Sequence, residues 1–259
     1  MPNSPDIFQV AAQDQPLMRQ IGLDAAGVFN DPRVRVWRSL PDRENCTLDQ
    51  KLPGGQTVRL HIKRYPKSPS PTPADIEVAG SRLLQQQSIP TAPPIAHGRL
   101  ADGRSFVIFK NLDGYTPADK LIESGTPFDA LLLPTADLAA MLHNRQLHHR
   151  DLYLCHFMAR VDGNSVDVKL IDAARVAELG NALTRRRWIT KDLAQFWYST
   201  TNLPISDAQR NDWLARYAKL RGTEPRKLIA SIRRKVRTIA RHDVKLNKNQ
   251  PRRNISLTD

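Results

Sequence analysis

The chain has 259 residues, of which 40% are hydrophobic and 25% are charged, and its formal net charge is +13. That composition is typical of a soluble globular protein, so it excludes the collagen-like, fully disordered and disulfide-scaffold classes. The two cysteines, Cys46 and Cys155, are too few for a disulfide framework and indicate a reducing compartment.

The amino terminus lacks the basic and then apolar segments of a secretory signal peptide, and no apolar run approaches the length of a membrane span. We therefore expect a cytoplasmic protein. The positive charge is concentrated in residues 210–259, which contain 15 Lys or Arg and 4 Asp or Glu. This segment is expected to bind an anionic partner, such as a phospholipid surface, a phosphorylated glycolipid or a nucleic acid.

Residues 45–63 predict a β-hairpin, because apolar and polar residues alternate along its second strand and Pro53-Gly54-Gly55 supplies the turn. The alternation places Lys63 on the face opposite the apolar side chains. The chain then predicts a proline-rich loop, a helix and a further strand, over residues 66–73, 74–87 and 105–109.

From residue 117 onward the apolar pattern is mainly helical. Helices are predicted over residues 130–145, 188–199 and 207–220, and two strands over residues 155–161 and 166–171, joined by a turn at Asp162-Gly163-Asn164. The sequence therefore predicts an α+β, two-lobed architecture. We expect a small β-rich amino-terminal lobe (1–111), a larger helical carboxyl-terminal lobe (112–225) and a basic tail (226–259).

The sharpest motif is His149-Arg150-Asp151-Leu152, which directly follows a predicted helix. Asp172 comes 21 residues after Asp151, at the end of a predicted strand. Kinases use this arrangement, in which one carboxylate orients the attacking hydroxyl and accepts its proton while the other holds a metal ion on the nucleotide phosphates. Taken alone, a His-Arg-Asp tripeptide is most often a surface turn, and a lone aspartate after a strand is a turn or cap residue.

Lys63 on the hairpin and Glu77 on the next helix fit the ion pair that positions a phosphate-binding ammonium in kinases. Taken singly, Lys63 is more often a solvated strand lysine and Glu77 an exposed helix residue. The four residues occur in the required order and on the required types of element, so together they favour a phosphotransferase.

The sequence resembles the bacterial lipopolysaccharide kinases, the family that contains Kdo kinase and core heptose kinase within the protein-kinase-like superfamily. The resemblance rests on His149-Arg150-Asp151 with Cys155-His156-Phe157, and on Leu170-Ile171-Asp172 with Arg175. It covers roughly residues 43 to 200 and implies a protein-kinase-like fold.

The resemblance also implies roles for individual residues. Asp151 is the expected catalytic base or hydroxyl-orienting residue, and Asp172 is the expected principal ligand of Mg²⁺. Lys63 is expected to contact the phosphates of ATP, with Glu77 as its partner. Three further residues are expected to support the catalytic loop: His149, Arg150 and Asp192.

His156 stands where protein kinases have an asparagine, five positions after the catalytic aspartate. Imidazole is a poor ligand for Mg²⁺, so we expect His156 to bind a metal ion only if that ion is Mn²⁺. The alternatives are a hydrogen bond to a phosphate or an aspartate, and simple packing within the loop.

Two kinase motifs are absent from the sequence, the G-x-G-x-x-G loop and the Ala-Pro-Glu segment. The expected function is ATP-dependent phosphorylation of a sugar hydroxyl, on Kdo or heptose, in the lipopolysaccharide inner core, with a lipid-linked sugar as the substrate. The alternatives are a kinase-like phosphotransferase that acts on another small molecule or a protein, and a catalytically inactive kinase-like binding module.

The tail predicts a basic amphipathic helix, since Leu228, Ile232, Val236 and Ile239 recur at helical spacing. Its apolar stripe is buried either against the carboxyl-terminal lobe or in a membrane interface, and residues 243–259 are expected to fray. An anionic membrane surface is an expected partner of residues 226–253, which would make the protein peripheral at the inner membrane. Nucleic acid is not expected, because no RNA-recognition motif or zinc-finger spacing occurs.

Overall fold

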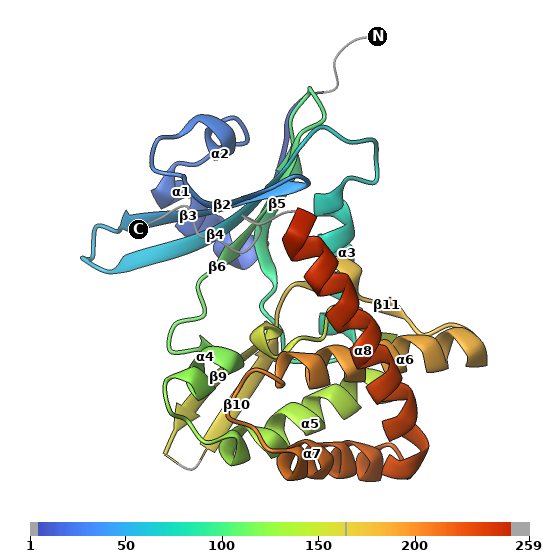
Figure 1. The fold of residues 1–259 in the computed structure, drawn as a ribbon. Helices are drawn as coiled ribbons and strands as arrows, with labels where there is room; N and C mark the ends of the chain where they lie inside the picture. The colour runs from blue at the N-terminus through green and yellow to red at the C-terminus, as the bar shows by residue number, and fades with distance from the viewer. Residues whose placement is uncertain (1–4, 164, 250–259) are drawn as a thin grey trace. The chain divides into compact units, whose positions relative to one another are not determined.

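The computed structural model describes residues 5–163 and 165–249 (Figure 1). The chain divides into two compact units: the first contains the described residues up to 82 and residues 92–112, and the second contains residues 83–91 and 113–249. The predicted α+β class is confirmed, because the first unit is built on an antiparallel sheet and the second is mainly helical.

The first unit contains a six-stranded antiparallel sheet with the strand order β1-β5-β6-β4-β3-β2. Its strands are β1 (Ile7–Val10), β2 (Arg35–Leu40), β3 (Arg43–Lys51), β4 (Thr57–Tyr65), β5 (Pro94–Arg99) and β6 (Ser105–Lys110). The predicted hairpin is confirmed as β3 and β4, whose register places Asn45 opposite Lys63. Gly55 in its turn has a φ of +82°, a conformation that glycine adopts without strain.

The two faces of β4 are covered differently. Val58, Leu60 and Ile62 belong to an apolar core on one face. On the other face, Val78 of helix α3 (Pro73–Gln86) packs with Tyr65 of β4. Since Lys63 alternates with the apolar residues, it shares the face of the sheet that α3 covers.

The first 40 residues contain elements that the sequence analysis did not anticipate. They form β1, β2, the short helices α1 (Gln15–Ile21) and α2 (Gly27–Asn30), and a 3₁₀ turn, η1 (Ala12–Asp14). Strand β1 pairs with β5, with Ile7 opposite Arg99, so its partner lies far along the chain. Such a short strand shows little alternation of its own and is recognisable only through its partner.

The second unit contains five helices among its described residues: α4 (Ala118–Glu123), α5 (Phe128–Asn144), α6 (Ala182–Ser199), α7 (Asp207–Leu220) and α8 (Pro225–Asn249). Helix α7 has the predicted bounds. Helix α6 begins six residues before the predicted start, because the side chain of Asn181 caps its amino terminus by accepting from the Thr184 amide at 3.1 Å.

Short strands and 3₁₀ turns connect these helices. They are β7 (Thr116–Pro117), β8 (Leu147–His148), η2 (Leu154–His156), β9 (Phe157–Asp162), β10 (Ser165–Leu170), η3 (Ala173–Arg175) and β11 (Ala177–Glu178). Strand β9 starts after residue 155, the predicted start, because η2 occupies Leu154 to His156. Strands β9 and β10 pair as predicted, whereas Asn164 of the predicted turn lies outside the described residues.

Helix α8 packs against helix α6 (Figure 1), and its apolar stripe is buried in the core of the second unit. Ile232 is 1% exposed, and Leu228, Val236 and Ile239 pack on the same apolar core. The sequence left two possible locations for this stripe, the carboxyl-terminal lobe and a membrane interface. The structure places it in the core of the protein. The expectation of fraying from residue 243 is wrong as far as Asn249, where α8 ends; residues 250–259 lie outside the described part. Among the described helices, none is both long and apolar enough to cross a bilayer.

Candidate active site

The loop that carries Asp151 is held by one face of helix α6. Asp192, fully buried, accepts hydrogen bonds from the backbone amides of His149 and Arg150, both at 2.7 Å. The side chain of Lys191 donates to the carbonyl oxygen of Arg150 at 2.8 Å. Burial alone would raise the pKa of Asp192, but the hydrogen bond from His143 and the amide donors outweigh it and hold this pKa below its ordinary value.

The same helix also reaches Asp151 itself. Gln195 accepts from the amide of Leu152 at 3.3 Å and turns its own amide nitrogen toward Oδ1 of Asp151 at 3.4 Å. Ser199, one turn further on, accepts from the amide of Leu154 at 2.9 Å. The loop is therefore anchored along four residues of α6 and not at a single point.

Two backbone conformations on either side of the site are unusual. Arg150 has a φ of +63° and Asp172 a φ of +64°, both in the left-handed region. Residues other than glycine enter this region at a cost, and such conformations cluster at functional sites. The Nε2–H of the buried His149 donates to the carbonyl oxygen of Ile171 at 3.1 Å, which joins the two segments just before each unusual residue.

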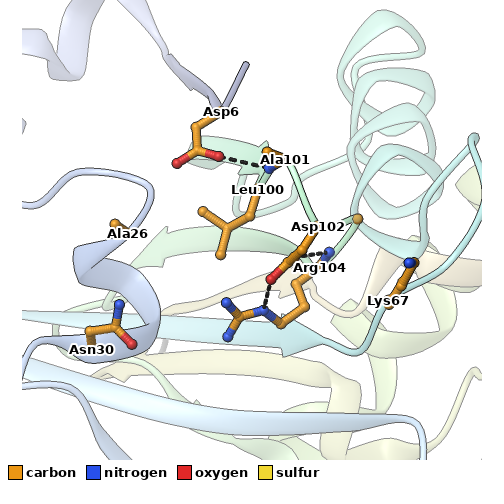
Figure 2. A pocket seen from close by; sticks show the side chains of 9 residues that line it. Asp6, Ala26, Asn30, Lys67, Leu100, Ala101, Asp102 and Arg104 are labelled. Atoms are coloured by element: carbon orange, nitrogen blue, oxygen red, sulfur yellow. Dashed lines mark hydrogen bonds and ion pairs between the residues drawn. The ribbon is translucent and has the colours of Figure 1, made fainter. Parts of the chain in front are cut away.

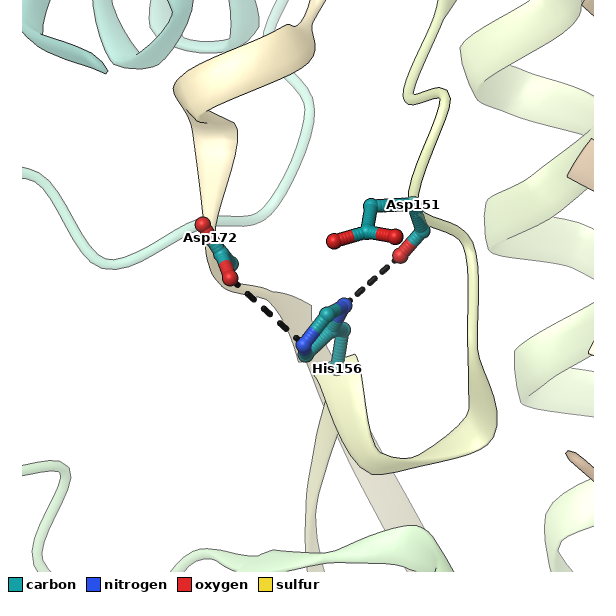
Figure 3. Close-up of side chains that lie close together, drawn as sticks. All are labelled: Asp151, His156 and Asp172. Atoms are coloured by element: carbon teal, nitrogen blue, oxygen red, sulfur yellow. Dashed lines mark hydrogen bonds and ion pairs between the residues drawn. The ribbon is translucent and has the colours of Figure 1, made fainter. Parts of the chain in front are cut away.

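Asp151, His156 and Asp172 converge at one point (Figure 3). One potential ligand atom from each residue lies within 4.8 Å of the others. Nδ1 of His156 donates to the carbonyl oxygen of Asp151 at 2.6 Å, and Nε2 faces Oδ2 of Asp172 at 3.6 Å. The imidazole therefore stands between the two aspartates, and only its Nε2 is left for another ligand.

The donor set of this cluster fits a divalent cation. Carboxylate oxygens are the preferred ligands of Mg²⁺ and Mn²⁺, and the imidazole nitrogen favours Mn²⁺ over Mg²⁺. Burial opposes protonation of His156, but its contact with Cys155 and the nearby carboxylates of Asp172 and Asp151 raise its pKa above the ordinary value. The two carboxylates therefore favour positive charge between them, so a divalent cation bound there would compete with a proton for Nε2 of His156.

Lys63 and Glu77 form an ion pair in the first unit, with Nζ and Oε1 2.5 Å apart. The side chain of Glu77 is fully buried and that of Lys63 is 20% exposed. The hydroxyl of Tyr65 donates to the second carboxylate oxygen of Glu77, also at 2.5 Å. Both oxygens of the buried Glu77 carboxylate thus have a donor. Glu77 in turn holds the partly exposed ammonium of Lys63 in position.

The candidate residues fall into two groups. Lys63 and Glu77 meet in the first unit. Asp151, His156 and Asp172 meet in the second, where Asp192 anchors the loop that leads into Asp151 and Asp172 follows strand β10. That all of them act on one nucleotide stays a prediction.

The sequence analysis did not identify Tyr65, Lys191, Gln195 or Ser199 as parts of the site. A signal for the last three exists, because the polar residues at positions 191, 195 and 199 are four residues apart and so share one face of the helix. Polar groups on a packed helix need partners, and here the partners belong to the loop that carries Asp151. No comparable signal exists for Tyr65.

A separate hollow of about 630 Å³ lies in the first unit (Figure 2). Asp6 accepts from the amide of Ala101 at its edge, and Arg104 is paired with Asp102. Because Arg104 is neutralised by Asp102 and the hollow includes neither Lys63 nor Glu77, we do not assign the hollow to the candidate site.

The comparison with known families decides between the kinase classes. Residues 25–217 match the model of the Lipopolysaccharide kinase (Kdo/WaaP) family. The chain belongs to this family. The match includes all eight candidate residues, from Lys63 to Asp192. The Lys63–Glu77 pair and the cluster around Asp151 therefore both lie within the region that this lipopolysaccharide kinase shares with its family.

Individual relatives match shorter stretches. The lipopolysaccharide core heptose(I) kinase WaaP of Escherichia coli strain K12 is 28% identical over 114 residues, which are 42% of this chain and 41% of that protein. WaaP of Pseudomonas aeruginosa strain PAO1 is 29% identical over 92 residues, 34% of each chain. A further WaaP from Escherichia coli is 32% identical over 87 residues, 32% of this chain and 31% of its own. Each alignment thus spans less than half of the relative's length.

Proposed function

We propose that the protein is a kinase that transfers a phosphoryl group from ATP to a sugar hydroxyl of the lipopolysaccharide inner core. The observation that carries this proposal is the cluster of Asp151, His156 and Asp172 in a chain of the lipopolysaccharide kinase family, with the loop of Asp151 anchored by Asp192. The paired Lys63 and Glu77 supply the second element that phosphoryl transfer needs, a fixed cation for phosphate oxygens.

In this mechanism Asp151 orients the acceptor hydroxyl and takes its proton. Gln195 restrains the Asp151 carboxylate. Lys63, held by Glu77, neutralises charge on the phosphates of ATP. Asp172, with Nε2 of His156, would hold a divalent cation, which when bound offsets the negative charge of the triphosphate. Most of the rate acceleration then comes from positioning and from charge neutralisation.

Heptose is the acceptor sugar that we favour, with Kdo as the alternative. The support is that the three relatives are each named as a core heptose(I) kinase. A lipid-linked acceptor also suits a protein with nine Lys or Arg in helix α8. Because the apolar stripe of α8 packs on the core, attraction to an anionic inner-membrane surface would use only its charged side chains.

The test is phosphoryl transfer from labelled ATP with Mg²⁺ or Mn²⁺ to deacylated inner-core acceptors that end in heptose or in Kdo. We expect Asp151→Asn and Asp172→Asn each to lower kcat at least 100-fold, since each removes a group that acts on a reacting atom or its phosphates. Asp167→Asn, which changes an exposed aspartate of β10, serves as the control and should keep normal activity. Full activity of the Asp172 variant would refute its assigned role, and transfer to Kdo alone would reassign the acceptor.

A further inference from the structure

A second charged site lies in the second unit, in a groove between helices α6 and α8. These helices pack together (Figure 1), and the groove between them has a volume of about 660 Å³. Six cationic side chains line it: Arg150, Arg186, Arg187, Lys191, Arg234 and Lys235. No aspartate or glutamate is among the lining residues, all of which are described.

The helical repeat explains why the charges gather here. Arg187 and Lys191 are four residues apart on α6, and Lys235 on α8 lies one turn beyond Ser231. The apolar stripe of α8, centred on Ile232, is buried against the core, so the neighbouring positions 231, 234, 235 and 238 form the wall of the groove.

The positive charge in the groove is not compensated within the described part of the chain. None of the six cations forms an ion pair with a described carboxylate. Instead, the guanidinium groups of Arg150 and Arg187 stack on the ring of Trp188, 4.2 and 4.9 Å from its centre. Nε of Arg150 is buried without a hydrogen-bond partner. Like charges held this close repel each other unless an anion lies between them.

The pKa of Lys191 is affected by burial and by the neighbouring positive charges. Burial and the nearby Arg175 lower its pKa below the ordinary value, although Asp151 and Asp192 act in the opposite direction. The groove also carries hydroxyl groups on both walls, from Thr190, Ser231 and Thr238. Cations and hydroxyls together are the groups that recognise phosphate oxygens.

We propose that the groove between α6 and α8 binds a phosphomonoester carried by a sugar, either free or as part of a glycolipid. Six cations exceed what one carboxylate would compensate, whereas a phosphomonoester carries up to two charges and three acceptor oxygens. The volume lies in the range of sites for small organic ligands, about 300–1,000 Å³, and so leaves room for the sugar beside its phosphate.

The groove is connected directly to the catalytic loop. Arg150 precedes Asp151 in the chain, and Lys191, which also lines the groove, donates to the carbonyl oxygen of Arg150. If the proposed kinase function holds, the groove would bind a phosphate group that the acceptor already carries. Binding of that phosphate would orient the acceptor without involving ATP.

Binding can be measured without catalysis, so it separates this site from the proposed function. The full chain is titrated with glucose 1-phosphate, and separately with vesicles that contain phosphatidic acid in a phosphatidylcholine background. Glucose and vesicles with the same fraction of phosphatidylglycerol, a phosphodiester, are the reference ligands. Binding that falls as salt rises is expected, because the contacts are ionic.

A matched pair of variants assigns any binding to the groove. Arg234→Gln with Lys235→Gln removes two charges from the groove, and Arg233→Gln with Arg237→Gln removes two from exposed positions of the same helix. We expect the groove variant to bind glucose 1-phosphate or phosphatidic acid at least tenfold more weakly than the wild type, and the control to stay within twofold. The probe with the larger loss identifies the carrier, free sugar or lipid.

Several outcomes would overturn the proposal. Equal losses in both variants would indicate a nonspecific basic surface, and equal affinity for phosphatidylglycerol would exclude recognition of a monoester. Groove-dependent binding of a phosphoserine peptide, with no binding of either sugar or lipid phosphate, would assign the groove to a protein partner. If the groove binds as expected while no acceptor is phosphorylated, the kinase proposal fails and the binding site stands.

Discussion

Glu77 is fully buried, and its two carboxylate oxygens have different donors, Lys63 and Tyr65. Tyr65→Phe removes one donor and leaves a buried oxygen unsatisfied, which costs about 1–3 kcal/mol. Because Glu77 would then hold Lys63 less firmly, we expect the KM for ATP to rise several-fold, with a smaller change in kcat. Steady-state kinetics with varied ATP measures the effect.

Tyr115→Phe is the matched control for this change. It also removes a hydrogen bond from a tyrosine hydroxyl to a carboxylate, that of Asp167, but this bond is exposed to solvent and lies in the second unit. Its KM for ATP should equal that of the wild type. An unchanged KM in the Tyr65 variant would mean that Lys63 needs no support from this hydrogen bond.

We expect His156 to influence which metal ion the cluster prefers. Its Nδ1 is committed to the Asp151 carbonyl, so only Nε2 can join Asp172 as a ligand. His156→Asn replaces this nitrogen with an amide oxygen, which suits Mg²⁺ better than imidazole does. We expect the ratio of Mn²⁺-supported to Mg²⁺-supported activity to fall at least threefold. A ratio that does not change would show that His156 is a packing residue and not a ligand.

At the scale of elements, the short strand pair of β8 and β11 is expected to make the fold sensitive to acid, because it contains the buried His148. His148 of β8 is 3% exposed, and its ring lies 5.3 Å from that of Trp188. Burial, together with the nearby charge of Arg150, lowers its pKa to about 4, and Asp192 opposes this only in part. A buried histidine with a depressed pKa stabilises the fold above its unfolded pKa of about 6.5, and this stability is lost as the pH falls toward 4.

His148→Gln is therefore expected to reduce the dependence of stability on pH. Between pH 7 and pH 5 the wild type should lose about 2 kcal/mol of unfolding free energy through this residue. Burial also lowers the pKa of His149, so the variant keeps a smaller loss in the same direction. Urea denaturation at the two pH values measures the difference, with the exposed His242→Gln as the control. Equal losses in all three proteins would rule out His148 as the acid-sensitive residue.

The elements that the sequence predicted are those whose signals are local. Alternation with a Pro-Gly-Gly turn defines the hairpin of β3 and β4, and a capping serine and apolar spacing define α7. Strand β1 was missed because its partner is β5, far along the chain, and the start of α6 was missed because Asn181 was not recognised as a cap. Pairing between distant strands and capping by a single side chain leave no periodic pattern in the sequence, so periodicity alone does not reveal them.

The candidate site shows the same limit. Residue types and order predicted Asp151 and Asp172 as a pair, but not the left-handed conformations of Arg150 and Asp172 that accompany their convergence with His156. These conformations depend on hydrogen bonds from His149 to Ile171 and from the loop to Asp192, which join positions 20 or more residues apart. A one-dimensional pattern contains the residues of such a network but not its connections.

At the scale of the whole molecule, the kinase proposal requires that Lys63 and Asp172, which belong to different units, act on the same ATP. A double-mutant cycle tests this directly. Lys63→Met and Asp172→Asn are each expected to weaken the binding of ATP with Mn²⁺. If both side chains contact one triphosphate, the effect of the double variant should differ from the sum of the two by more than about 0.5 kcal/mol, since groups that share a partner are not additive.

The control cycle combines Asp172→Asn with Arg59→Gln, which changes an exposed arginine on the same strand as Lys63 that pairs with Asp49. Those two effects should add within about 0.3–0.5 kcal/mol, because the two residues have no shared partner. Calorimetric titration of the four proteins in each cycle provides the free energies. Additivity in the Lys63 cycle would mean that the two units bind ATP independently or that only one of them does, and the catalytic assignment of Lys63 would then have to be withdrawn.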